Sequence, residues 1–78
     1  MREITQSESQ LLMWQFQPGM MGSWQRKLWD LMAISDSGNL NSLEKAFPHE
    51  VGTYRRFSTE HGYWKELCDA ARKQGWNI

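Results

Sequence analysis

Residues 39–64 read NLNSLEKAFPHEVGTYRRFSTEHGYW, and the fold expected for the whole chain follows from them. An apolar run at helical spacing ends at Phe47, and Pro48 comes next. Proline disfavours helical geometry in the residue before it, yet it is well tolerated in the first turn of a new helix. The stretch therefore predicts a helix that ends at Phe47, a sharp corner, and a second helix over residues 48–57.

The helix over residues 48–57 carries apolar side chains at helical spacing. We expect Val51, Tyr54 and Phe57 to point inward because they recur every three residues, with Tyr54 and Ser58 as the alternative inward pair. Gly52 in the same helix costs about 1 kcal/mol relative to alanine. A neighbouring helix that approaches closely at Gly52 would compensate for that cost, and this approach is expected.

A last helix is predicted after Phe57, with Ser58 or Thr59 as its cap. Its apolar stripe consists of Tyr63, Trp64, Leu67, Cys68 and Ala71. Gly75 lies where a left-handed residue ends a helix, and Trp76 should fold back on the last turn.

Upstream of this stretch, another helix is predicted over residues 24–35 with Ser23 as its cap. Its expected inward face is Trp24, Leu28, Leu31 and Met32, which leaves Trp29 and Ile34 outside the stripe. The run DSGN at residues 36–39 should end this helix with Gly38 in a left-handed conformation. Asn39 or Asn41 would then cap the helix that ends at Phe47.

The amino-terminal segment is less regular. Residues 1–10 are polar and are expected to be frayed, although Ser7 and Gln10 have the spacing of a capping box. The run LLMWQFQ at residues 11–17 fits a strand or a helix, and we favour a short helix because no second strand is visible to pair with it. The prediction is an all-α bundle of three to four short helices in one domain, residues 1–78, with residues 1–22 as a flexible or partner-ordered arm.

Composition limits the classes of function. Nine basic and nine acidic residues cancel, which disfavours a nonspecific nucleic-acid binder. The chain has no apolar run long enough to span a membrane and no signal-peptide pattern, so a cytoplasmic protein is expected. Cys68 is the only cysteine, so an internal disulfide is excluded and stability must come from packing of the ten aromatic residues.

No catalytic or metal-binding pattern is visible. His49 and His61 lie twelve residues apart on different predicted elements, and surface or capping roles are expected for both. Cys68 lies mid-helix on the predicted apolar stripe, where a thiol is inert. The glycines are scattered rather than clustered into a phosphate-binding loop. We therefore expect no enzyme activity, no cofactor and no metal.

The candidate partner-binding residues are Trp14, Met20, Met21, Trp29, Arg55 and Arg56. Met20 and Met21 could fill the edge of the core or form an adaptable contact surface. Arg55 and Arg56 lie between two aromatic residues, and they could form either a solvated face or a binding patch.

Residues 24–64 resemble a group of small, uncharacterised helical proteins of tailed phages and prophages. The likeness is carried by Asn39-Leu40, Leu43, Phe47-Pro48, Val51, Tyr54, Phe57 and Gly62-Tyr63-Trp64. These positions mark helix junctions and core, and no functional residue is transferred with them. The resemblance implies a phage protein in a bacterial cytoplasm, where many small phage proteins bind a host protein such as a defence nuclease.

Three functions remain open from the sequence. The first is a non-enzymatic protein-binding module, such as a phage-encoded inhibitor or modulator of a host anti-phage defence protein. The second is a helix-turn-helix-like regulator that would place the helix over residues 48–57 in the DNA major groove. The third is a self-associating component of a phage particle or assembly intermediate.

Overall fold

The computed structural model describes residues 2–78, which form five α-helices, one short 3₁₀ turn and no strand. The elements are α1 (Gln6–Phe16), η1 (Pro18–Met20), α2 (Ser23–Ile34), α3 (Ser37–Ala46), α4 (Pro48–Thr59) and α5 (Tyr63–Lys73). The all-α prediction is confirmed, with five helices in place of three to four.

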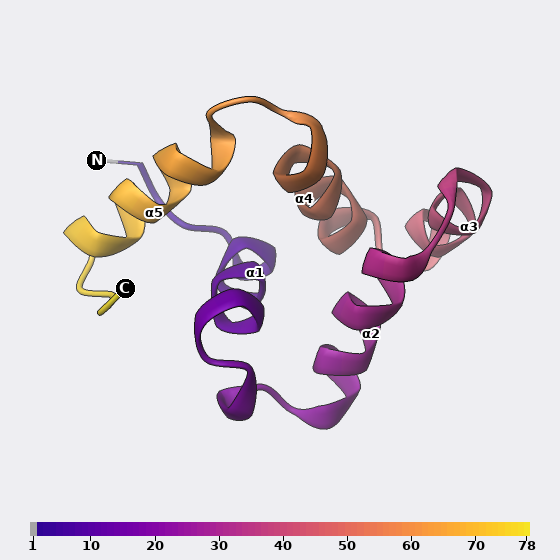
Figure 1. The fold of residues 1–78 in the computed structure, drawn as a ribbon, viewed down its shortest axis with the longest axis horizontal. Coiled ribbons are helices and arrows are strands. Elements are labelled where there is room, and N and C mark those ends of the chain that lie inside the picture. The colour runs from indigo at the N-terminus through magenta and orange to yellow at the C-terminus, as the bar shows by residue number, and fades with distance from the viewer. Residues whose placement is uncertain (1) are drawn as a thin grey trace.

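The helices form a flat array whose Cα atoms span 36 × 27 × 17 Å. α1 lies near the middle and packs against α2 and α4, while α4 also packs against α3 and α5 (Figure 1). α2 and α3 form the end of the array farthest from α5 (Figure 1). α4 is therefore in contact with three other helices, and α2 lies towards one end of the molecule.

The corner between α3 and α4 forms as the sequence predicts. The Phe47 N–H donates to the Leu43 carbonyl at 2.8 Å and closes α3, and the Val51 N–H donates to the Phe47 carbonyl at 3.0 Å and opens α4. Phe47 itself is non-helical, with φ −131°. Pro48 occupies the first turn of α4, where its missing N–H leaves no hydrogen bond unmade.

α5 also ends as predicted, at a left-handed glycine. Gly75 has φ +98°, its N–H donates to the Arg72 carbonyl, and the Trp76 N–H donates to the Ala71 carbonyl at 3.0 Å. These two bonds form a Schellman motif, which satisfies carbonyls that the end of a helix would leave free.

The start of α1 differs from the prediction. Residues 2–10 are not frayed, and the capping box is formed by Thr5 and Glu8 rather than by Ser7 and Gln10. The Glu8 N–H donates to Thr5 Oγ1 at 3.2 Å, and the Thr5 N–H donates to Glu8 Oε1 at 3.0 Å. Ser7 is buried, and its hydroxyl bonds the Thr53 hydroxyl of α4 at 2.7 Å. Met1 lies outside the described residues.

Three other helix starts are also shifted from their predicted caps. Asp36 caps α3 by accepting from the Asn39 N–H at 2.8 Å, so Gly38 lies inside that helix rather than in a left-handed turn. Gly62, with φ +84°, precedes α5 in place of a serine or threonine cap. Gly22 precedes α2 and makes no side-chain cap. Each shift is of one to five residues and leaves the helix itself in place.

The buried face of α2 is rotated from the predicted one. Leu28, Trp29 and Met32 are buried, whereas Trp24 and Leu31 are exposed. Trp29 has no exposed surface, and its indole N–H donates to the buried Gln10 Oε1 at 3.0 Å. The prediction that Trp29 is exposed is therefore wrong. Apolar residues cover more than half of the circumference of α2, so periodicity alone did not determine which half faces the core.

The core joins all five helices. Its members are Leu11, Leu12, Met21, Leu28, Trp29, Met32, Leu40, Val51, Tyr63, Leu67, Cys68 and Ala71. Val51 is fully buried as predicted, and Tyr54 and Phe57 are partly buried against this core. The predicted stripe of α5 is also confirmed, with Trp64 as its one partly exposed member.

Candidate functional site

The six predicted binding residues do not form one surface. Met20 is exposed, but Met21 and Trp29 belong to the core. Trp14 is half-buried, its ring lies 5.9 Å from the Trp29 ring, and its N–H donates to Asp30 Oδ1 at 2.9 Å. Met21 and Trp29 are therefore unable to meet a partner unless the core opens.

Arg55 and Arg56 are each held by neighbours within the chain. Arg55 Nη2 donates to Asn41 Oδ1 at 2.6 Å and lies 3.7 Å from the Glu44 carboxylate. Arg56 Nε pairs with Glu60 at 3.0 Å, and its guanidinium lies 4.2 Å from the centre of the Tyr63 ring. The two arginines point to different elements and do not form a common patch.

The partly buried aromatic rings form a continuous row between α1, α4 and α5. The Trp14 ring lies 6.4 Å from both Tyr54 and Phe57, and Phe57 lies 5.1 Å from Trp64. Trp64 in turn stacks on Phe16 at 5.7 Å. Edge and stacked pairs of this kind stabilise packing beyond the area they bury. Much of the aromatic excess in the sequence therefore serves to hold three helices together.

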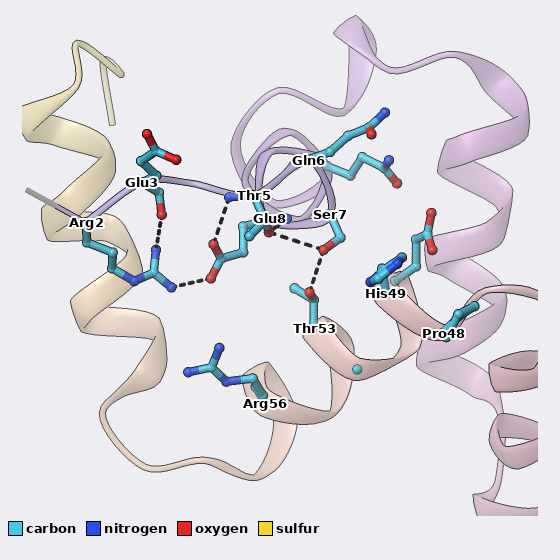
Figure 2. Close-up of a pocket in the computed structure, with 13 residues that line it drawn as sticks. Arg2, Glu3, Thr5, Gln6, Ser7, Glu8, Pro48, His49, Thr53 and Arg56 are labelled. Carbon is cyan, nitrogen blue, oxygen red and sulfur yellow. Dashed lines mark hydrogen bonds and ion pairs between the residues drawn. The ribbon is translucent and has the colours of Figure 1, made fainter.

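A groove of about 780 Å³ runs between the start of α1 and α4 (Figure 2). Near one end of it lies the Glu8 cluster, which we define as Arg2, Glu8, Tyr63 and Glu66. Glu8 is almost fully buried, and its carboxylate accepts from Arg2 and from the Tyr63 hydroxyl at 2.6 Å. Arg2 also pairs with Glu66 of α5 at 2.7 Å. The cluster thus ties the amino-terminal residues to α1 and α5.

The Glu8 cluster keeps its carboxylate charged in a buried position. Burial alone would raise the pKa of Glu8, but hydrogen bonds from Arg2, the Thr5 backbone N–H and Tyr63 outweigh it and hold the pKa below its ordinary value of 4.5. Burial and the Glu8 carboxylate raise the pKa of the Tyr63 hydroxyl, which therefore stays protonated and donates. Because its members satisfy one another, removing any one of them would leave a buried charge or donor without its partner.

Gly52 lines the same groove, and no helix approaches it. A Cβ built at Gly52 meets no atom within 4 Å, so the close approach expected from the sequence is wrong. Gly52 instead leaves space in the wall of the groove.

Replacing Gly52 by alanine should stabilise the protein by about 0.5–1 kcal/mol, because alanine fits the helical backbone and restricts the unfolded chain more than glycine does. Urea unfolding measures this change. The matched control is Gly62→Ala, which should destabilise the protein because Gly62 has φ +84°. A Gly52→Ala protein less stable than wild type would contradict the expectation.

Three large apolar side chains of α2 are exposed. Trp24, Leu31 and Ile34 are 63%, 46% and 82% exposed, respectively. Together with Lys27 they fall within an arc of about 80° on the helix, because successive residues are about 100° apart. We call these four residues the α2 outer face. The Trp24 ring also contacts Phe47 at 5.4 Å, so the end of α3 borders this face.

The sequence-based prediction for this face is wrong at two of its three apolar residues. Helical spacing predicts Trp24 and Leu31 in the core and Ile34 outside the apolar stripe. In the structure all three are on the solvent side. Single exposed apolar residues are ordinary on protein surfaces, whereas several on one helix face indicate an interaction site.

The chain has one thiol and two imidazoles, which are the side chains most often used in catalysis or in metal binding. Cys68 is buried, and burial raises the pKa of its thiol. His49 and His61 are both exposed. Within residues 2–78, no three His, Cys, Asp or Glu side chains are grouped as metal ligands.

In the described part of the chain, no helix combines the length and the apolarity needed to cross a membrane. The α2 outer face, where three large apolar side chains are exposed together, is the candidate functional site on geometric grounds. Comparison of the chain with profiles of protein families, with curated proteins and with solved structures finds no match.

Proposed function

We propose that this protein is a non-enzymatic protein-binding module that uses the α2 outer face as its interface. The observation that carries the proposal is the joint exposure of Trp24, Leu31 and Ile34 on one side of a packed helix. Fully burying one large apolar side chain is worth about 1.5–3 kcal/mol, so three of them can supply much of the affinity of a specific complex. Tryptophan is also among the residues that most often dominate binding energy.

The context of the proposal comes from the resemblance of residues 24–64 to small helical phage proteins. On that basis the partner is a protein or complex of a bacterial host, and the activity is inhibition or modulation of an anti-phage defence protein in the host cytoplasm. A chain of 78 residues can act in this way by covering a surface of its target. A standard interface needs only about 800 Å² from each partner.

The surroundings of α4 favour this proposal over DNA binding. A recognition helix needs an exposed basic face to enter the major groove. α4 instead packs against α1, α3 and α5, and its two arginines are occupied by Asn41, Glu44 and Glu60. The described surface of α4 therefore offers little free positive charge to a phosphate backbone.

Photo-cross-linking from the α2 outer face tests the proposal. A photoreactive phenylalanine derivative would be placed at Leu31 or Ile34 and, as a control, at the exposed His61 in the turn between α4 and α5. In lysate of the bacterium that carries the gene, we expect one cross-linked protein from positions 31 and 34 and none from position 61. The same products from all three positions would contradict an interface on α2.

A double variant, Leu31→Glu with Ile34→Glu, should lose this partner while keeping the fold. Both positions are solvent-exposed, so the free energy of unfolding should change by less than about 1 kcal/mol. As a competitor in the cross-linking experiment, the variant should be at least about ten-fold weaker than wild type, since a charge placed in an apolar interface is desolvated without a partner. Equal competition by the two proteins would refute the role of these residues.

A further inference from the structure

The cations that form no ion pair within the described residues are unevenly distributed, and most of them lie near the α2 outer face. Among residues 2–78, six ion pairs are formed, and they involve Arg2, Arg55, Arg56, Lys65 and Arg72. The cations outside these pairs are Arg26, Lys27, Lys45 and Lys73. All four are exposed.

Three of these four cations lie on α2 and on the end of α3 that borders it. Lys27 is part of the α2 outer face, whereas the preceding residue, Arg26, points about 100° away from Lys27 and lies off this face. Lys45 lies in the last turn of α3, two residues before Phe47, whose ring contacts Trp24 at 5.4 Å. Unpaired positive charge therefore borders the exposed apolar residues on the helix itself and on its neighbour.

The acidic residues of the same region are already engaged within the chain. Asp30 accepts from the Trp14 indole N–H at 2.9 Å, and Asp36 accepts from the Asn39 N–H at 2.8 Å. Glu44 lies 3.7 Å from Arg55 Nη2. The hydrogen bonds to Asp30 and Asp36 come from neutral donors and leave both carboxylates charged. With Glu44 paired to Arg55, the three cations still outnumber these two carboxylates, so the region carries a small positive surplus although the formal charge of the whole chain is zero.

We propose that the α2 outer face binds an acidic protein surface, in which an apolar patch is bordered by carboxylates that meet Lys27 and Lys45. This inference rests on the proposed function and specifies its partner. Complementary charges at the border of an interface speed association and reject partners of the wrong sign. The apolar centre supplies affinity, and the surrounding cations select which apolar surface is bound.

Charge and shape favour this occupant over others. A second copy of the chain packed through the same face would bring the same positive surplus to both sides of the interface, which is repulsive. A nucleic acid would supply anionic phosphates, but it offers no apolar surface to cover Leu31 and the highly exposed Ile34. An acidic protein surface satisfies both features.

The test uses two synthetic helical peptides of about 18 residues, or five turns. Both carry the same leucine stripe, and their remaining positions are glutamate-rich in one and lysine-rich in the other. Binding of each labelled peptide to the full chain is measured at about 50 mM and about 300 mM salt. We expect at least about ten-fold tighter binding of the glutamate peptide at low salt, and a smaller preference at high salt.

Charge-reversed variants locate the effect. Lys27→Glu combined with Lys45→Glu should abolish or reverse the preference, whereas Lys73→Glu on α5, the matched unpaired cation elsewhere, should leave it unchanged. The inference is overturned by equal binding of the two peptides, by no binding of the glutamate peptide up to about 1 mM, or by equal effects of the two sets of variants.

Other occupants are outcomes of the same test. Tighter binding of duplex DNA or of phosphatidylglycerol vesicles than of the glutamate peptide would overturn the inference, as would concentration-dependent dimerisation that Leu31→Glu abolishes. If cross-linking from Leu31 captures one partner but the peptides show no charge preference, the binding function stands and the acidic partner fails. If the preference is seen but no partner is captured, the proposed function itself fails.

Discussion

Trp29→Ala is expected to unfold a large fraction of the protein at room temperature. Trp29 has no exposed surface, it packs on Trp14, and it donates a hydrogen bond to the buried Gln10. Truncating a buried tryptophan costs about 3–5 kcal/mol through lost burial and the cavity left behind. A single hydrophobic core in a domain this small rarely supplies more than about 3–5 kcal/mol, so the variant should retain little or no stability.

Trp24→Ala is the matched control, because it removes the same side chain from the same helix. Trp24 is mostly exposed and touches Phe47 at its edge, so a loss of about 0.5–1.5 kcal/mol is expected. Urea unfolding followed by circular dichroism measures both variants without relying on tryptophan fluorescence. Equal losses, or a larger loss for Trp24→Ala, would mean that the buried face of α2 is the one its periodicity first indicated.

Glu8→Gln should reduce stability by about 2–3 kcal/mol, since it keeps the shape of the side chain but removes the charge that Arg2 and Tyr63 bind. Arg2 remains partly exposed and keeps its pair with Glu66, which limits the loss to less than that of a fully buried ion pair. Urea unfolding at neutral pH measures the difference.

The control for this variant is Glu66→Gln. Glu66 is the exposed partner of the same arginine, and exposed ion pairs contribute about 0–1 kcal/mol. If Glu66→Gln lost as much stability as Glu8→Gln, the exposed Arg2–Glu66 pair would contribute as much as the buried Glu8 carboxylate, which would contradict the expectation.

The pH dependence of stability should identify the same carboxylate. The pKa of Glu8 is lowered in the folded protein, so its charged form adds stability above the unfolded pKa, near 4.5. This contribution is lost as the pH falls below that value and through the lower pKa of the folded state. The stability difference between wild type and Glu8→Gln should therefore be constant near neutral pH and shrink below about pH 4.5. A difference that stays constant down to pH 3 would contradict a charged Glu8.

Some features of the candidate site could be predicted from the sequence, and others could not. Exposure of Met20 and the Glu60 pairing of Arg56 are local matters that spacing could indicate. The α2 outer face was missed because Trp24 and Leu31 fit a helical stripe as well as Trp29 does. Which side of such a helix is buried depends on α1, whose Gln10 lies 19 residues before Trp29 and accepts its hydrogen bond.

The amino-acid sequence by itself determined the features that act over a few residues. Pro48 fixed the corner between α3 and α4, Gly75 ended α5, and the apolar stripe of α5 set its buried face. Each of these follows from backbone geometry or from side chains one turn apart, so no distant residue was needed.

Only the tertiary structure decided between alternatives that were locally equal. Thr5 with Glu8 and Ser7 with Gln10 have the same capping-box spacing, and the first pair is used because Glu8 also meets Tyr63, 55 residues away. Likewise, the side of α2 that carries Trp29 faces the core, where its indole N–H donates to Gln10, and Ile34 is exposed to solvent. In both cases the choice depended on burying a polar group with its partner, and that partner came from another helix.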